Sequence, residues 1–292
     1  MFLNAIRKNF VACNQTRDDK FRKIFKEMIG MDFVTLNNGI KMPMIGFGVY
    51  QIPNNETARC VLNAIKAGYR SIDTAQWYGN ESGVGTAIES SGIARSEFFI
   101  TTKIQSGRNI ERSIEESLKN LKTDYIDLML IHWVMGNDLE IYRVMEKYYR
   151  RGIFKSIGLS NFYGRNYSEI VANAEIKPQV IQQEVHVLHQ NEDFRKICVR
   201  DGIQLEAWSP LAAAHENIFQ NPVLKKISDK HRKTTAQIML RFLVDRNIVA
   251  IPKSSHKNRM IENISVFDFK LDSDDMTEIK TLDRGKSLFG WY

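Results

Sequence analysis

Residues 56–92, ETARCVLNAIKAGYRSIDTAQWYGNESGVGTAIESSG, alternate between two local patterns, and this alternation indicates the fold class. Apolar residues recur at helical spacing in 56–68 and again in 80–92, which predicts two amphipathic helices. The short segment 70–73 between them has the length and the flanking turn residues of a buried strand. A strand placed between two helices predicts the repeating unit of a parallel sheet.

The same alternation continues along the chain from Met44. Eight short apolar or β-branched segments are each followed by a helical segment, and eight parallel strands can close into a barrel. The strands are expected near 44–50, 70–73, 98–103, 125–131, 156–160, 179–185, 204–208 and 248–252.

A hairpin is expected before the first of these strands. Residues 33–45, FVTLNNGIKMPMI, place two strand-like pieces on either side of Asn38-Gly39, a dipeptide that favours a hairpin turn. The sequence therefore predicts an α/β fold, a (β/α)8 TIM barrel with an N-terminal β-hairpin cap, formed by residues 31–292 as a single domain.

The composition excludes several classes of protein. The 292 residues are 43% hydrophobic, which is enough for one large core. No run of about 18 apolar residues predicts a transmembrane helix. Cys13, Cys60 and Cys198 are too few and too scattered for a disulfide framework or a zinc site, which fits a reducing compartment, and we expect a cytoplasmic protein.

The formal charge of +7 is unevenly distributed, because residues 1–30 hold seven Lys and Arg against three Asp and Glu. The rest of the chain suits an anionic cofactor, and without a zinc-finger or RNA-recognition motif we expect no nucleic-acid partner. Residues 1–30 are expected to be an extension, helical in part around 21–29. The first 17 residues contain no acid and faintly resemble an organelle transit peptide, which is a minor alternative.

Four ionisable residues are expected at the carboxyl ends of the strands, where barrel enzymes have their active sites. Asp73, Lys103 and His132 each end a predicted strand, and Tyr78 follows Asp73 in a loop. Each of them taken alone has a simpler explanation as a packed or solvated side chain. Four such residues at one edge of a barrel favour a catalytic site.

These four side chains have complementary chemistry. A tyrosine has a pKa of about 10, and the ammonium of Lys103 would lower the pKa of Tyr78. Asp73 would be the counter-ion of a buried Lys103, and His132 would orient a carbonyl oxygen or share its proton. Such a group is suited to protonating a carbonyl oxygen. The hydride must then come from a cofactor, because no side chain donates hydride.

The sequence lacks the G-x-G-x-x-G fingerprint of a dinucleotide-binding Rossmann domain. After the eighth predicted strand, residues 251–263, IPKSSHKNRMIEN, place Lys253, Ser254 and Arg259 near the start of a helix. Barrels frequently bind phosphate groups at this position. A solvated basic patch is the alternative.

From about Phe33 to its end, the chain resembles the aldo-keto reductase family, whose members fold as (β/α)8 barrels and bind NADPH without a Rossmann domain. The resemblance is carried by GYRSIDTAQWYGNE (68–81), ITTK (100–103), IHW (131–133), GLSNF (158–162) and IPKSSHKNRMIEN (251–263). It implies reduction of aldehydes and ketones to alcohols with NADPH preferred over NADH. Tyr78 would be the general acid, with Asp73, Lys103 and His132 completing the catalytic tetrad.

The resemblance also assigns residues to the cofactor. Ser160, Asn161 and Gln182 would hold the nicotinamide carboxamide, and Trp208 stands where the family usually has a tyrosine stacked on the nicotinamide. Lys253, Ser254 and Arg259 would bind the 2′-phosphate. The full set of implied cofactor contacts is Gly48, Val49, Ser160, Asn161, Gln182, Trp208, Ser209, Leu211, Lys253, Ser254, Arg259, Glu262 and Asn263.

The implied substrate pocket is aromatic, with Tyr50, Trp77 and Trp133 at positions that line it in the family. The loop after His132 is short and the chain stops soon after LFGWY (288–292), so we expect an open pocket for a small-molecule carbonyl substrate. Small or aromatic aldehydes and dicarbonyls should react better than bulky steroids. We expect a monomer.

In the stretch EVHVLH (184–189), Glu184, His186 and His189 are expected on a strand end and loop and not on the helix that the H-E-x-x-H motif requires, so we expect no metal.

Two other functions remain open at this point. In one, Lys103 forms a Schiff base with a carbonyl substrate, which would make the protein an aldolase. In the other, the chain binds NADPH as a non-catalytic sensor or partner subunit, although the intact set of four ionisable residues counts against this reading.

Overall fold

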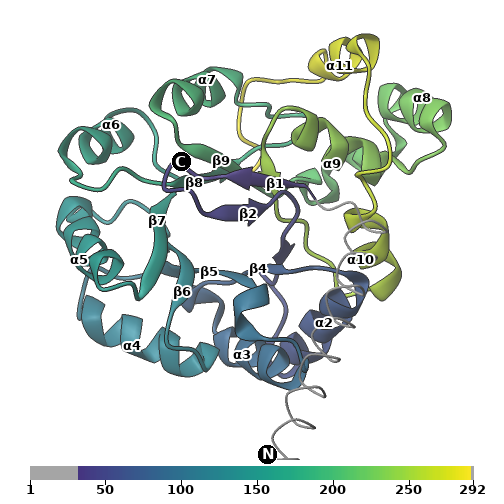
Figure 1. The fold of residues 1–292 in the computed structure, drawn as a ribbon. Helices are drawn as coiled ribbons and strands as arrows, with labels where there is room; N and C mark the ends of the chain where they lie inside the picture. Colours follow the sequence, from purple (N-terminus) through teal and green to yellow (C-terminus); the bar gives the residue numbers. More distant parts are fainter. Residues whose placement is uncertain (1–31, 291–292) are drawn as a thin grey trace, which may run out of the picture.

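A computed structural model of the chain describes residues 32–290, so the expected N-terminal extension 1–30 lies outside the described residues. Eight parallel strands follow one another in chain order around a sheet with helices on its outer side (Figure 1). The strands are β3 (Phe47–Gly48), β4 (Ser71–Asp73), β5 (Phe99–Ile104), β6 (Ile126–Ile131), β7 (Phe154–Ser160), β8 (Val180–Glu184), β9 (Gln204–Trp208) and β10 (Val249–Ala250). Each lies where the sequence predicted a strand.

The first and last strands of this sheet meet and close the barrel. Parallel bridges join Ile45 to Ala250 and Gly48 to Lys253. The Gly46 amide donates to the Ala250 carbonyl at 2.9 Å, and the Ala250 amide donates to the Met44 carbonyl at 3.0 Å. The predicted (β/α)8 barrel is confirmed.

The helices surround the barrel because their apolar stripes are buried against the strands or against neighbouring helices. In α5 (Asp138–Arg150), for example, Ile141, Tyr142 and Met145 are fully buried. The other α-helices are α2 (Asn54–Ala67), α3 (Glu81–Ser90), α4 (Ile110–Leu121), α6 (Gly164–Asn173), α7 (Glu192–Asp201), α8 (Pro222–His231), α9 (Thr235–Asp245), α10 (Lys257–Ile264) and α11 (Ser273–Lys280). Within residues 32–290, no helix is long and apolar enough to cross a membrane.

The predicted hairpin covers the end of the barrel at which the strands begin. Strand β1 (Phe33–Thr35) pairs antiparallel with β2 (Lys41–Pro43). At the hairpin tip, Asn37 Nδ2 donates to the Pro178 carbonyl at 2.9 Å, and Asn38 Nδ2 donates to the Lys155 carbonyl at 3.0 Å. These carbonyls lie at the start of β8 and β7. The opposite end, where the strands finish, is left for the site.

Two glycines in α3 allow close helix packing. A Cβ atom on Gly85 would lie 2.4 Å from the main-chain oxygen of Asn120 in α4, and one on Gly83 would lie 2.7 Å from the Cβ of Thr57 in α2. Real Cβ atoms do not approach other atoms this closely. The GVG sequence at 83–85 therefore brings neighbouring helices together.

Replacing Gly85 with alanine should destabilise the protein, although alanine is the better helix former by about 1 kcal/mol. We expect a loss of about 1–3 kcal/mol in the free energy of unfolding. The main chain of Asn120 and Leu121, and not a flexible side chain, blocks the new methyl group. Urea unfolding measures this, with the exposed Thr86→Ala as control in the same helix. A Gly85→Ala variant as stable as the control would contradict the packing role.

Candidate active site

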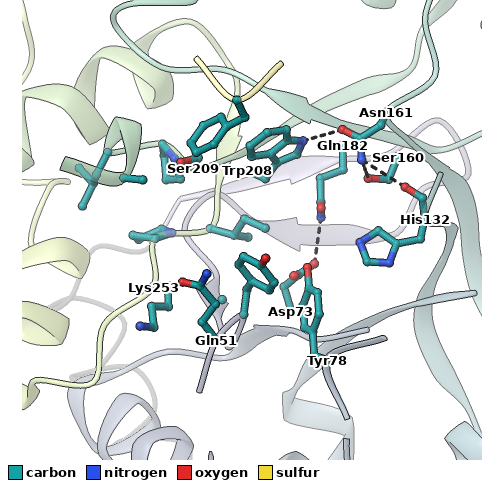
Figure 2. A pocket seen from close by; sticks show the side chains of 18 of the residues that line it. Gln51, Asp73, Tyr78, His132, Ser160, Asn161, Gln182, Trp208, Ser209 and Lys253 are labelled. Carbon is teal, nitrogen blue, oxygen red and sulfur yellow. Dashed lines mark hydrogen bonds between the residues drawn. The ribbon is translucent and has the colours of Figure 1, made fainter. Parts of the chain in front are cut away.

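The four ionisable residues predicted from the strand ends come together. Asp73 is the last residue of β4, Lys103 lies in β5, and His132 follows β6 directly. Tyr78 ends the 3-10 helix η1 (Gln76–Tyr78), which follows β4. Because β4, β5 and β6 are parallel neighbours, their carboxyl ends lie side by side. Asp73, Tyr78 and His132 line a cavity of about 390 Å³ (Figure 2).

Lys103 is the centre of this group and is fully buried behind the cavity wall. Its ammonium donates to Asp73 Oδ1 at 2.6 Å, to the Thr74 carbonyl at 2.9 Å and to the Tyr78 hydroxyl at 3.3 Å. An ammonium has three protons, so all of its donors are used. The Tyr78 hydroxyl is thereby held at one position.

The pKa values of Lys103 and Tyr78 differ in part from the sequence prediction. Burial lowers the pKa of Lys103, but Asp73 and Tyr78 raise it, and the net shift is upward. Burial also raises the pKa of Tyr78 to about 12, because Lys103 offsets only part of the desolvation. The prediction that Lys103 lowers the tyrosine pKa is right for the contribution of Lys103 and wrong for the net shift.

His132 is a neutral imidazole at physiological pH. It is 5% exposed, and burial together with the charge of Lys103 lowers the pKa of His132 to about 3. Its ring centroid lies 5.6 Å from that of Tyr78. A neutral imidazole that lines the same cavity as Tyr78 can donate a hydrogen bond to an oxygen atom but has no extra proton to transfer. Of the two roles predicted for His132, orientation of the oxygen therefore fits the geometry.

The opposite side of the cavity presents amide groups beside a flat aromatic ring (Figure 2). The indole nitrogen of Trp208 donates to Asn161 Oδ1 at 2.9 Å, and Asn161 Nδ2 donates to Ser160 Oγ at 3.0 Å. The amide nitrogen of Gln182 donates to Asp73 Oδ2 at 2.9 Å. These bonds fix both side-chain amides, so the wall fits a planar ring that carries a carboxamide.

The structure separates the predicted cofactor residues into two groups. Those that line the cavity are Gly48, Ser160, Asn161, Gln182, Trp208, Ser209, Leu211 and Lys253. The other five are Val49, Ser254, Arg259, Glu262 and Asn263.

These five residues lie outside the cavity wall for different reasons. Val49 is fully buried, so only its main chain could reach a ligand. Ser254 accepts a hydrogen bond from the His256 amide at 3.1 Å just before α10. Arg259, Glu262 and Asn263 lie in α10 itself, where Arg259 is exposed and Asn263 is buried.

The predicted aromatic pocket residues all line the cavity. Tyr50 stacks on Trp77 with 6.2 Å between ring centroids and lies 5.0 Å from the ring of Tyr78. Trp133 stacks on His132 at 5.8 Å. Trp77 is 61% exposed, which places it at the mouth of the cavity.

The sequence prediction missed one wall of the cavity, which the end of the chain supplies. Phe289 packs on Trp208 with 5.2 Å between ring centroids and on His215 at 5.4 Å. Buried Glu184 holds this segment, accepting from Ser287 Oγ at 2.6 Å and from the Leu288 amide at 2.9 Å. The cavity is therefore less open than the short chain end suggested.

Glu184 also contacts His186 Nε2 at 2.9 Å. Across the described part of the chain, no group of three or more His, Cys, Asp or Glu side chains is arranged to hold a metal ion. Within EVHVLH, Glu184 thus connects β8 to the segment around Ser287 and Leu288.

With this geometry established, comparison with known proteins identifies the family. The Aldo/keto reductase family profile matches residues 44–284. The chain belongs to the aldo-keto reductase family. Members of this family act on carbonyl compounds with a nicotinamide cofactor, so the chain is an oxidoreductase of that kind.

Two related aldo-keto reductases are named for small dicarbonyl substrates. Glyoxal reductase of Bacillus subtilis is 45% identical over 264 residues, which cover 88% of this chain and 95% of the relative. Methylglyoxal reductase DkgA of Escherichia coli is 38% identical over 260 residues, covering 87% and 94% respectively.

Solved aldo-keto reductases share the fold. An enzyme from a Medee basin deep-sea metagenome library superposes with a TM-score of 0.85 at 44% identity, covering 88% of this chain and 97% of that one. The Bombyx mori aldo-keto reductase in complex with NADP has a TM-score of 0.82 at 32% identity, covering 88% and 94%.

The low pKa of His132 predicts the shape of the pH profile. His132 stays neutral above about pH 3, so we expect no inflection in kcat/KM from this residue between roughly pH 5 and 7.5, the range in which an ordinary histidine titrates. The measurement compares the wild type with His132→Asn, which keeps a hydrogen-bond donor. An inflection near an ordinary histidine pKa that disappears in the variant would show that His132 titrates during catalysis.

Proposed function

We propose that this aldo-keto reductase reduces small aldehydes and ketones to alcohols with NADPH as hydride donor and Tyr78 as proton donor. One observation carries the proposal: the Tyr78 hydroxyl faces the cavity while Lys103 Nζ, anchored by Asp73, donates to it at 3.3 Å. A hydroxyl held in this way is positioned to protonate an oxygen atom bound in the cavity.

The high pKa of Tyr78 is compatible with this role. When a hydride reaches the carbonyl carbon, the oxygen becomes an alkoxide, which is a stronger base than a phenolate of pKa about 12. The proton therefore moves downhill from Tyr78 to the substrate. Lys103 stabilises the phenolate that remains, and neutral His132 orients the oxygen.

The chain's residues fit a nicotinamide cofactor. Ser160, Asn161 and Gln182 would hold the carboxamide beside the Trp208 indole, whose orientation is fixed by its bond to Asn161. Once bound there, the reduced nicotinamide supplies hydride to the carbonyl carbon. Lys253 lines the cavity, and Arg259 is exposed on α10 outside the cavity wall; both would bind a 2′-phosphate.

The cavity favours small neutral substrates. Its volume of about 390 Å³ must hold both the nicotinamide and the substrate. Among the described residues that line it, Lys253 is the only Lys or Arg, and we assign Lys253 to the cofactor. The aromatic wall formed by Tyr50, Trp77 and Trp133 offers no cation for a carboxylate, so we propose short aldehydes and dicarbonyls as substrates, as the names of the two relatives suggest.

The structure argues against the Schiff-base alternative. A nucleophilic lysine needs a lowered pKa, whereas the pKa of Lys103 is raised and its ammonium is bonded to Asp73. A non-catalytic NADPH sensor is disfavoured by a proton donor that faces the cavity. We further propose a cytoplasmic monomer, which light scattering and a fluorescent fusion would test.

Tyr78→Phe should reduce the rate of carbonyl reduction by roughly 10²- to 10⁴-fold, because it removes only the proton donor. NADPH binding, followed by fluorescence titration, should stay within about twofold of the wild type. Tyr50→Phe is the matched control, since Tyr50 lies in the same cavity with its ring 5.0 Å from that of Tyr78. Full activity in Tyr78→Phe would end the assignment.

Arg259→Ala should raise the KM for NADPH by roughly 10- to 100-fold, the effect of one charge-assisted hydrogen bond, while the KM for NADH changes little. Steady-state kinetics with both cofactors measures the difference. Arg112→Ala on α4 is the control, because it also removes one exposed guanidinium. Equal losses for NADPH and NADH would mean that Arg259 does not contact the 2′-phosphate.

A further inference from the structure

A second carboxyl group lies inside the barrel next to the catalytic tetrad. Glu206 is in the middle of β9 and is fully buried. The amide nitrogen of Gln182 donates to Glu206 Oε2 at 2.8 Å and to Asp73 Oδ2 at 2.9 Å. Glu206 is therefore connected to the counter-ion of Lys103 through one amide group.

This connection fixes the orientation of Gln182. A side-chain amide nitrogen carries two hydrogens, and here one goes to each carboxyl group. Neither is left for a ligand, so the amide can offer a bound molecule only its carbonyl oxygen. If Gln182 contacts a carboxamide, it does so as an acceptor.

The charges around Glu206 do not balance if it is ionised. Asp73 on β4 and Lys103 on β5 are the charged groups that face it, and they neutralise each other at 2.6 Å. Its neighbour on β8 is the neutral Gln182, and its partner on β10 is the apolar Val249. An ionised Glu206 would be a second buried anion beside a single cation.

The remaining oxygen of Glu206 shows where a proton belongs. Oε1 is buried and has no hydrogen-bond partner within residues 32–290. Oε2 already accepts from Gln182, so Oε1 is the oxygen available to be protonated. An unpaired buried anion costs far more than an unpaired hydroxyl. In agreement, burial and then the charge of Asp73 raise the pKa of Glu206 to about 8.

We propose that Glu206 is a positioning residue that carries a proton at neutral pH and controls the acidity of Tyr78 through Gln182, which it shares with Asp73, and through its charge beside Asp73 and Lys103. While Glu206 is neutral, the positive charge of Lys103 acts on Asp73 and Tyr78 alone. Once Glu206 ionises, a second negative charge makes Tyr78 hold its proton more tightly. The kinetic consequence rests on the proposed function, in which Tyr78 donates that proton.

The first experiment measures the pH dependence of kcat/KM for the wild type and for Glu206→Gln, which stays neutral at all pH values. We expect the wild type to lose activity between about pH 7 and pH 9.5 as Glu206 ionises. The ratio of kcat/KM at about pH 9.5 to kcat/KM at about pH 7 should be roughly threefold to tenfold larger in Glu206→Gln than in the wild type. This is the effect of one added charge on a nearby pKa. Superimposable profiles would overturn the proposal.

The second experiment does not depend on catalysis. The unfolded chain loses the Glu206 proton near the ordinary glutamate pKa, while the folded chain keeps it to a higher pH, so stability falls as pH rises across this interval. The melting temperature of Glu206→Gln relative to the wild type should therefore increase from about pH 4.5 to about pH 8. A purely structural role would give a pH-independent difference.

A matched control and a direct observation complete the test. Glu146→Gln on α5 removes another fully buried carboxyl, one that bonds Arg143 and the Ile176 amide, and should not flatten the alkaline limb of the profile. Infrared difference spectra should show a protonated-acid carbonyl band in the wild type at neutral pH that Glu206→Gln lacks. Should that variant not fold, titration of this band in the wild type decides alone, and its absence would refute the proposal.

The two proposals fail in different ways. If no aldehyde supports NADPH oxidation by the wild type, the proposed function fails, while the infrared band and the melting temperatures still report whether Glu206 holds a proton. If reduction proceeds and the band is absent, only the role of Glu206 fails.

Discussion

The site depends on one buried ion pair, that of Lys103 with Asp73. The two side chains are 0% and 3% exposed and their charged atoms lie 2.6 Å apart. Removing each ion from water costs several kcal/mol, which only a short, fully hydrogen-bonded pair offsets. The ends of β4 and β5 must therefore meet in one register. The same pair places a positive charge against the Tyr78 hydroxyl, so one interaction both holds the end of the barrel together and positions the hydroxyl that we propose as the proton donor.

The ion pair also organises the nearby polar groups. Thr74 contributes its main-chain oxygen to Lys103, and Gln182 contributes its amide nitrogen to the second oxygen of Asp73. Each new contact satisfies a group that burial would otherwise leave unpaired. Glu206 joins this set through Gln182. The proton that we propose on Glu206 would keep a second negative charge away from this single ion pair.

The cavity is completed by segments that are irregular and far apart in the sequence. The 3-10 segment η3 (Ala212–Gln220) contains residues with positive φ that are not glycine, among them Ala213, Ala214 and Glu216. Such backbone is strained by about 1–3 kcal/mol per residue and persists only where its surroundings hold it. Here Glu216 pairs with Arg284, and His215 packs on Phe289. The loop after β9 and the chain end thus support each other beside Trp208.

The amino-acid sequence alone was enough to predict the barrel and the grouping of Asp73, Tyr78, Lys103 and His132 at one end of it. Helical and strand periodicities are local properties, and eight repeats of one unit leave few topologies, so the order of residues along the chain is enough to place the strand ends at one edge. The Asn38-Gly39 turn is local in the same sense. The ion pair of Asp73 with Lys103 could be inferred too, because an acid and a base end two adjacent predicted strands.

The net pKa shift of Tyr78 and the cavity wall formed by Phe289 could be found only from the folded structure. Gln182 and Asp73 are 109 residues apart, so no sequence pattern shows that one amide joins Asp73 to Glu206. Desolvation raises the pKa of Tyr78 while the charge of Lys103 lowers it, and both effects depend on burial depth and distance. The packing of Phe289 on Trp208 likewise exists only once the chain end has folded back, because through-space contacts of this kind follow from the closed barrel and not from neighbouring residues.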